Sequence, residues 1–320
     1  MRLVELRESG LYCPPADSYI DPWGPVERAI ITHAHPEHAS AGSGAYLSSS
    51  DGEPLLRALV GPDAAIQTAA YGEAITINEV KISFHPAGHM LGSAQIRLEH
   101  SGEIWVASGD YQLQQDPTCA PFEPVRCHTF VTESAFGLPI FRWPTEPIDD
   151  INVWWRANQE AGKSSILFLH PIGMAQRVLA SIDASIGAIH AHEAIAPINQ
   201  IYRAQGVGLP STSAKIEPGG MILAPLSAHG STWARSLKKI SDAMVSGWMR
   251  IRGPRRRRSL DRGFAFSNHA DWPGLLRAID ETAAETILVT HAHRVPLARW
   301  LEEHGRRAFP LDAPYQEVEL

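Results

Sequence analysis

The sequence lacks long apolar runs and contains few cysteines. No stretch approaches the ~18 consecutive apolar residues of a membrane-spanning helix, and the first eight residues include two arginines and two glutamates, unlike a signal peptide. Its three cysteines, Cys13, Cys119 and Cys127, have no CxxC spacing, which argues against a disulfide framework and a thiolate metal site. We therefore expect a cytoplasmic protein without membrane association, whose cysteines are buried thiols.

Positive charge is also scarce, with one local exception. The 320 residues carry a net charge of −7, which is unusual for a protein that binds phosphate-rich polymers. Between residues 250 and 262, however, seven arginines accompany a single acid, Asp261. A basic segment on an acidic chain is typical of a phosphate-binding track, although many such segments are solvated loops. The nucleic-acid-binding candidates are Arg250, Arg252, Arg255, Arg256, Arg257 and Arg258.

Histidine is abundant, and several of the fifteen histidines follow short apolar runs. Runs of this length that are rich in Ile, Val, Phe and Trp and bounded by Gly or Pro predict β-strands. Six of them occupy residues 28–32, 80–84, 103–107, 129–132, 263–266 and 286–290. The polar residues beyond their ends are His33, His89, Asp110, Glu133, His269 and His291. If these strands form sheets of one domain, their ends lie along one edge, where loops usually hold the chemistry.

The middle of the chain has a different pattern. From residue 148 to residue 250, helical and strand-like segments alternate, and no strand-end carboxylate stands out. We therefore predict an α/β protein of two domains. One domain comprises residues 1–147 and 251–320, and a smaller domain, residues 148–250, is inserted into it.

The loop that follows the first predicted strand is rich in metal-binding groups. The sequence His33-Ala-His-Pro-Glu-His38 places four potential ligands within six residues. His33 and His35 can direct two imidazoles at one ion, while Glu37 and His38 continue towards a second. Imidazole and carboxylate groups without thiolates favour a catalytic site for zinc, manganese or iron.

Three later residues complete two such sites. His89 and His291 supply further imidazoles, and Asp110 can bridge two ions with its two carboxylate oxygens. His293 competes with His291, which we prefer because it directly follows a predicted strand. Two ions about 3.5–4 Å apart can share a hydroxide and hold the attacking and leaving groups of a phosphoryl transfer.

These motifs resemble those of the metallo-β-lactamase superfamily. The loop from His33 to His38, with His89, Asp110 and His291, is similar to its metal motifs, and Asp21 in Ile-Asp-Pro is similar to its supporting aspartate. Two further residues resemble motifs of the β-CASP branch, which processes DNA or RNA and carries an inserted domain. They are Glu133 in Thr-Glu-Ser-Ala-Phe-Gly and His269 in Ser-Asn-His-Ala-Asp.

The resemblance narrows to the bacterial ligase-associated DNA exonucleases and runs from about residue 10 to residue 305. It rests on five further segments, residues 12–15, 86–93, 116–125, 246–252 and 269–274. It implies a four-layer αββα sandwich with a smaller inserted α/β (β-CASP) domain. It also implies a DNA exonuclease of DNA repair that works with an ATP-dependent DNA ligase and a helicase.

The resemblance further implies a role for each site residue. The first metal is assigned to His33, His35 and His89, the second to Glu37, His38 and His291, and both to Asp110. Zinc is the expected metal, with manganese as the alternative. Water held between the two ions attacks phosphorus. His269, charged and held by Glu133, protonates the departing oxygen.

Glu37 departs from the family pattern, which has an aspartate at this position. Because glutamate is one methylene longer, its oxygen can overshoot the second metal. Weaker occupancy of that site, altered metal preference and a catalytically weak nucleic-acid-binding subunit all remain open. An RNA-processing nuclease is a further alternative, whereas the inserted domain, the Glu133 and His269 pair and the arginine segment argue against a small-molecule hydrolase.

Overall fold

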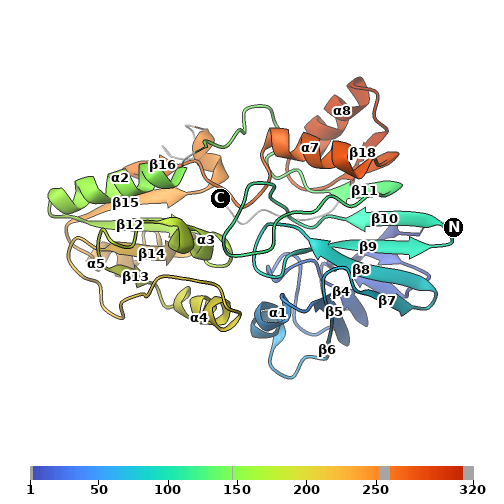
Figure 1. Cartoon of the computed structure of the whole chain (residues 1–320), viewed down its shortest axis with the longest axis horizontal. Helices are drawn as coiled ribbons and strands as arrows, with labels where there is room; N and C mark the ends of the chain where they lie inside the picture. Colours follow the sequence, from blue (N-terminus) through green and yellow to red (C-terminus); the bar gives the residue numbers. More distant parts are fainter. Residues whose placement is uncertain (1–2, 146, 252–259, 313–320) are drawn as a thin grey trace. The chain divides into compact units, whose positions relative to one another are not determined.

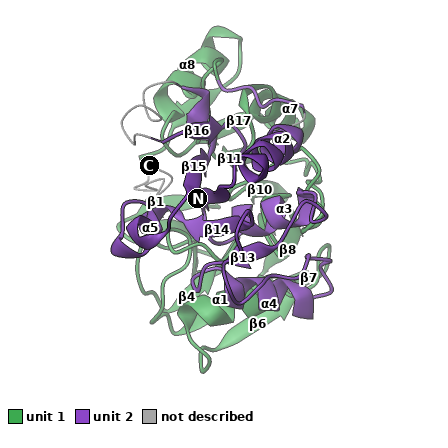
Figure 2. Cartoon of the chain, turned by 90° about the vertical axis from the view of Figure 1, so that its left-hand side faces the viewer, with its two compact units in different colours: residues 1–140, 269–317 green, residues 141–268, 318–320 purple. Residues whose placement is uncertain are grey.

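The computed structural model describes residues 3–145, 147–251 and 260–312 and divides the chain into two compact units. The chain passes from unit 1 to unit 2 after Ile140 and returns to unit 1 at His269. Figure 2 shows the two units in different colours. The arginines at positions 252 and 255–258 lie outside the described residues, and of the nucleic-acid-binding candidates only Arg250 lies within them.

Unit 1 contains two β-sheets. The six-stranded sheet has the order β1-β2-β3-β4-β5-β6, and the seven-stranded sheet has the order β18-β17-β11-β10-β9-β8-β7. The strands of the first sheet are Glu5–Arg7, Gly10–Cys13, Ser18–Ile20, Arg28–Ile30, Ala45–Ser49 and Ile66–Ala69. The strands of the second, from β7 to β11 and then β17 and β18, are Ala74–Ile77, Val80–Pro86, Ala94–His100, Glu103–Ala107, Thr129–Thr132, Thr286–Val289 and Ala308–Pro310.

The two sheets of unit 1 enclose an apolar core. Ile30 and Leu47 of the first sheet belong to the same buried cluster as Ile82 and Ile96 of the second. The opposite face of the seven-stranded sheet is covered by α7 (Trp272–Thr282) and α8 (Arg294–Glu303), whose buried leucines join a second cluster with Phe130. Figure 1 shows these two helices beside β11 and β18. The short helix α1 (Glu53–Val60) follows β5.

Unit 2 is built on a parallel sheet of five strands in the order β13-β14-β12-β15-β16. These strands are Ile189–Ala191, Met221–Pro225, Ser164–Leu169, Ile240–Val245 and Arg262–Phe264. The central strands β12 and β14 are buried along their whole length, as expected for a parallel sheet covered on both faces. The helices of this unit are α2 (Pro147–Glu160), α3 (Met174–Ser181), α4 (Ala196–Ala204), α5 (Thr232–Ser236), and the 3₁₀ turns η1 (Leu226–Ala228) and η2 (Gly247–Arg250).

The strand before His269 differs from the sequence-based expectation. We expected it to belong to the same domain as the other strands that end at site residues, but β16 pairs in parallel with β15 of unit 2. The composition of a short apolar run does not reveal its pairing partner, and this partner lies in another sheet. His269 nevertheless belongs to unit 1, because the chain crosses between the units directly before it.

All three cysteines are free thiols. Cys13 and Cys127 are buried and Cys119 is partly buried, and burial raises the pKa of the Cys127 thiol to about 12. A thiol with such a pKa is inert at neutral pH. Within residues 3–145, 147–251 and 260–312, no helix has the length and apolar character needed to cross a membrane.

Candidate metal centre

The candidate ligands of unit 1 stand on loops that follow β-strands. The loop beginning at His33 follows β4, His89 follows β8, Asp110 follows β10 and His291 follows β17. Gly109, directly before Asp110, has a φ of 55°, and a Cβ there would come within 2.6 Å of the side chain of Thr32. Glycine is therefore required for the Asp110 turn to pack against the loop that carries His33.

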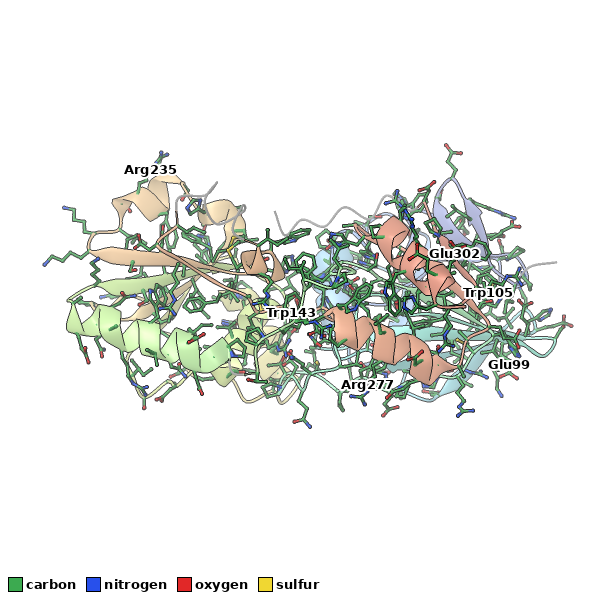
Figure 3. All side chains as sticks on the ribbon, turned by 90° about the horizontal axis from the view of Figure 1, so that it is seen from above. Glu99, Trp105, Trp143, Arg235, Arg277 and Glu302 are labelled. Atoms are coloured by element: carbon green, nitrogen blue, oxygen red, sulfur yellow. The ribbon has the colours of Figure 1, made fainter. Side chains whose placement is uncertain are left out.

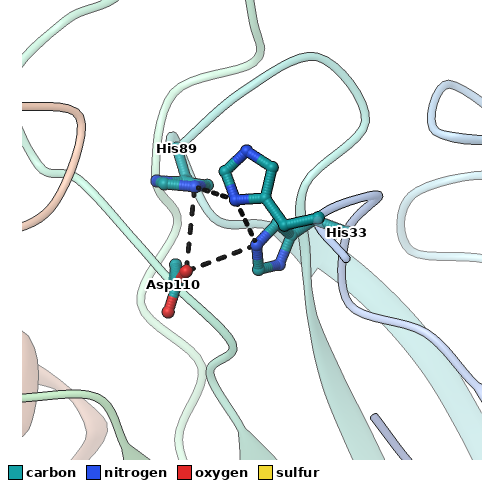
Figure 4. A group of neighbouring side chains, drawn as sticks. His33, His89 and Asp110 are labelled. Carbon is teal, nitrogen blue, oxygen red and sulfur yellow. Dashed lines mark hydrogen bonds and ion pairs between the residues drawn. The ribbon is translucent and has the colours of Figure 1, made fainter. Parts of the chain in front are cut away.

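The first ligand group consists of His33, His35, His89 and Asp110, and all four residues are buried. His33 Nε2 lies 3.2 Å from His35 Nδ1 and 3.3 Å from Asp110 Oδ2. His89 Nε2 lies 3.5 Å from His35 Nδ1 and 3.8 Å from Asp110 Oδ2. Figure 4 shows these side chains converging on one point.

The second ligand group consists of His38, Asp110 and His291, which are also buried. His38 Nε2 lies 3.4 Å from Asp110 Oδ2, and His291 Nε2 lies 3.2 Å from Asp110 Oδ1. Asp110 thus belongs to both groups. Each of its carboxylate oxygens faces at least one imidazole nitrogen.

Hydrogen bonds on the outer side fix which nitrogen of three imidazoles carries the proton. Thr290 Oγ1 donates to the Thr132 carbonyl, so it must accept from His291 Nδ1–H at 2.7 Å. Thr32 Oγ1 likewise donates to Asp21 Oδ2 and accepts from His33 Nδ1–H.

The third imidazole is oriented by Asp21 directly. His38 Nδ1–H donates to Asp21 Oδ2 at 2.8 Å, and Asp21 is itself held by the Thr32 backbone N–H at 2.8 Å. With a cation bound, neutral rings in these tautomers would direct unprotonated Nε2 atoms at it. Such outer hydrogen bonds are typical of metal-binding histidines.

The spacing of the ligand atoms fits a small divalent cation. Ligands ~2.0–2.1 Å from a tetrahedral ion lie about 3.3 Å from one another, and the contacts within the first group measure 3.2–3.8 Å. Among the described residues, Asp110 Oδ1 is buried yet forms no hydrogen bond. A buried carboxylate oxygen is costly unless it is paired, and a cation between the Nε2 atoms and Asp110 would satisfy it.

The electrostatics of the centre depend on Asp110. Burial raises the pKa of this carboxyl, but the neighbouring imidazoles of His38, His269, His291 and His33 hold it well below its ordinary value. Burial lowers the pKa of His38, but Asp110 and Asp21 raise it well above its usual range. Burial and the neighbouring His38 lower the pKa of His33. Asp110 is therefore ionised at neutral pH, and His33 is neutral.

Glu133 and His269 form a buried pair beside the ligand groups. His269 Nδ1–H donates to Glu133 Oε2 at 3.1 Å, and the Tyr111 backbone N–H donates to Glu133 Oε1 at 2.7 Å. The ligand atoms of Asp110, Glu133 and His269 all lie within 4.8 Å of one another. The His269 and His89 rings are in edge contact, with centroids 4.7 Å apart. A carboxylate-bound imidazole at this position can transfer a proton next to the ligands.

The structure brings together every site residue expected in unit 1 except Glu37. The Glu37 carboxylate belongs to neither ligand group among the described residues and lies 3.8 Å from His35 Nδ1, with 20% of its side chain exposed. His293 also stays outside both groups, since its Nδ1–H donates to the Ala135 carbonyl at 2.7 Å. Sequence reasoning missed Thr32 and Thr290, although the repeated Thr-His pair directly after a strand was a readable signal.

Comparisons with known proteins give partial matches. No model of a known protein family matches the chain. Over 310 residues, or 94% of the chain, it is 26% identical to a protein of Opitutus terrae named a probable DNA ligase, of which the match covers 30%. It is also 34% identical over 77 residues to the endoribonuclease Ysh1 of Emericella nidulans, covering 23% of this chain and 9% of that protein.

A longer match to the same kind of protein involves the endoribonuclease Ysh1 of Yarrowia lipolytica. It is 26% identical over 120 residues, covering 37% of this chain and 14% of that protein. The chain spans less than a third of the length of these curated relatives. Together the similarities support the metallo-β-lactamase superfamily, to which the β-CASP endoribonucleases belong.

The structural comparison concerns the fold alone. A protein of unknown function from Enterococcus faecalis V583 superposes with a TM-score of 0.57, covering 91% of this chain and 80% of that one at 10% identity. The two proteins therefore share a similar fold over most of both chains.

Proposed function

We propose that this protein is a two-metal nuclease that hydrolyses phosphodiester bonds, most specifically a DNA exonuclease acting in repair beside an ATP-dependent DNA ligase. The observation that carries the proposal is the convergence of imidazole nitrogens on the Asp110 carboxylate, with the Glu133 and His269 pair beside them. The similarity to a protein named a probable DNA ligase supports the link to ligation. The fold is proposed to be the four-layer αββα sandwich with unit 2 as its inserted β-CASP domain.

The two ligand groups would each hold one ion. His33, His35, His89 and Asp110 would hold the first, and His38, Asp110 and His291 the second. Two divalent ions, for which zinc or manganese suits the donor set, would supply an acidified water and positive charge beside the reacting phosphate.

The protein's own residues would orient the metal ligands and transfer a proton. Asp21 and Thr290 hold the rings of His38 and His291 in the tautomer that directs Nε2 inwards. Glu133 stabilises the imidazolium of His269 through Nδ1–H, so that Nε2–H can protonate the departing oxygen. The burial of these groups excludes water and strengthens each electrostatic contact.

A cleavage assay with metal analysis tests the proposal. The purified protein should contain two divalent ions per chain and shorten end-labelled single-stranded DNA stepwise, and chelation should stop the reaction. End-labelled RNA of the same sequence is the second substrate, because the Ysh1 matches favour an RNA-processing nuclease as the alternative. Faster cleavage of RNA would favour that alternative. Two bound ions without cleavage of either polymer would leave a binding subunit and overturn the proposal.

The position of Glu37 gives a separate prediction about the second ion. Because its carboxylate lies beside His35 and outside both groups, Glu37→Gln should retain two ions per chain and change turnover by less than about tenfold. Metal content after dialysis and single-turnover rates measure this. Loss of one ion would mean that Glu37 is a metal ligand, as the motif predicted. Metal content of Glu37→Asp would then show whether the shorter side chain binds the ion more tightly.

A further inference from the structure

Unit 2 contains a cavity that the proposed chemistry does not use. Its volume is about 260 Å³, slightly below the ~300–1,000 Å³ of pockets for drug-sized ligands. The cavity lies where the start of α2 meets η2 and β16. It is lined by Pro144, Pro147, Asp150, Met249, Arg250, Arg262, Gly263, Phe264 and Ala265.

The two arginines of this cavity stand on ordered elements. Arg262 lies in β16, opposite Ala243 of β15, and Asp261 before it is held by the Asp242 side chain at 2.9 Å. Arg250 ends the η2 turn, which begins where the Ser246 hydroxyl accepts the Trp248 backbone N–H. Side chains on such elements are positioned more precisely than side chains on loops.

The lining combines positive charge with apolar walls. The lining includes two arginines, Arg250 and Arg262, and one acid, Asp150, and the Arg262 guanidinium lies over the Phe264 ring, 5.1 Å from its centroid. The rest of the lining offers proline, methionine, glycine, alanine and phenylalanine surface. Met249 packs closely against Gly263: a Cβ at position 263 would lie only 2.7 Å from the Sδ of Met249. Arginine binds phosphate through paired N–H groups, and apolar walls suit a sugar or a base.

We propose that this cavity binds one nucleotide unit of the nucleic-acid strand, with its phosphate between Arg250 and Arg262. The inference rests on the proposed nuclease function and names a contact for its substrate outside the metal centre. Arg262 precedes His269 by seven residues, so one short segment of the chain carries both a phosphate contact and the proton donor. Phosphate contacts of this kind fix the register of a strand without reading its sequence.

The test is the salt dependence of strand binding. A fluorescent single-stranded 12-nucleotide DNA with phosphorothioate linkages, which resist hydrolysis, is titrated with the whole metal-loaded protein, and Kd is measured between 50 and 200 mM salt. The binding constant K falls as salt rises, and the plot of log K against log salt has a negative slope. Each lost phosphate contact on a single strand reduces the magnitude of this slope by about 0.7. Arg250→Ser and Arg262→Ser should each reduce the magnitude of the slope by about 0.7. This change corresponds to binding that is about fivefold weaker at 0.1 M salt.

Two further variants make the result specific. Arg235, an exposed arginine on α5 of the same unit that points away from the ribbon, is the matched control, and Arg235→Ser should leave the slope unchanged (Figure 3). Arg262→Lys keeps the charge and should keep most of the slope, which also guards against a folding defect in Arg262→Ser. The inference would be overturned if Arg250→Ser and Arg262→Ser showed the same salt dependence as the control Arg235→Ser. Because binding is measured on a strand that resists hydrolysis, this outcome is independent of whether the protein cleaves DNA.

Discussion

Replacing Asp110 by asparagine should remove bound metal and abolish cleavage. Asp110 is the one residue present in both ligand groups, and asparagine keeps its shape but loses the charge. Two-metal sites stabilise a phosphoryl transition state by several kcal/mol, and each 1.4 kcal/mol is a factor of ten, so the loss in turnover should be at least about 10³-fold. Metal content by mass spectrometry and single-turnover cleavage of end-labelled DNA give the two measurements.

A second buried carboxylate provides the matched control for this variant. Asp116 is 7% exposed and accepts hydrogen bonds from the Thr118 backbone N–H and hydroxyl, outside both ligand groups. Asp116→Asn retains the accepting oxygen and should keep two ions and near-parent turnover. Equal losses in both variants would mean that Asp110 only supports the fold. Full cleavage by Asp110→Asn would disprove the metal centre.

The positions of the candidate ligands could be predicted from the sequence because these residues follow short strands. The apolar runs before His33, His89, Asp110, Glu133 and His291 all form strands of unit 1. Apolar composition and short length are local properties, so they can be recognised in a single sequence. The convergence of the strand ends then follows from placing the strands in sheets of one domain.

Three features of the site could not be predicted from the local sequence. The pairing of β16 with β15 depends on a partner distant in space, and the apolar run before His269 has the same composition in either sheet. Glu37 lies beside His35 because of the turn between them, which a motif does not specify. The hydroxyl of Thr290 reaches the Thr132 carbonyl, 158 positions away, before it orients His291.

The polar groups of the centre are costly to bury unless a cation is present. Asp110 and the six histidines at positions 33, 35, 38, 89, 269 and 291 are each less than a tenth exposed. Burying a carboxylate among these imidazoles carries a desolvation penalty of several kcal/mol that contacts must offset. Because metal binding then contributes to folding, the protein with metal should be more stable than the protein without it.

Replacing His269 by alanine should slow cleavage while leaving two ions bound. The proposed proton donor contributes about 10²–10⁴-fold to such a reaction, and His269 belongs to neither of the groups that would hold the two ions. Glu133→Gln should slow the reaction less, since the amide oxygen can still accept from Nδ1–H but no longer stabilises the imidazolium. Metal content and the single-turnover rate on end-labelled DNA are the measurements, and both variants should keep two ions per chain.

A substrate with an activated leaving group separates proton transfer from the other roles that His269 could have. Nitrophenolate leaves without protonation, so the nitrophenyl ester of thymidine monophosphate should be hydrolysed by His269→Ala at nearly the parent rate, although DNA is not. His293→Ala is the matched control, because that imidazole is bound to the Ala135 carbonyl outside the ligand groups, and it should retain activity on both substrates. If His269 instead binds metal with Asp110 and Glu133, as their mutual distance within 4.8 Å also permits, its removal will release an ion and slow both substrates equally.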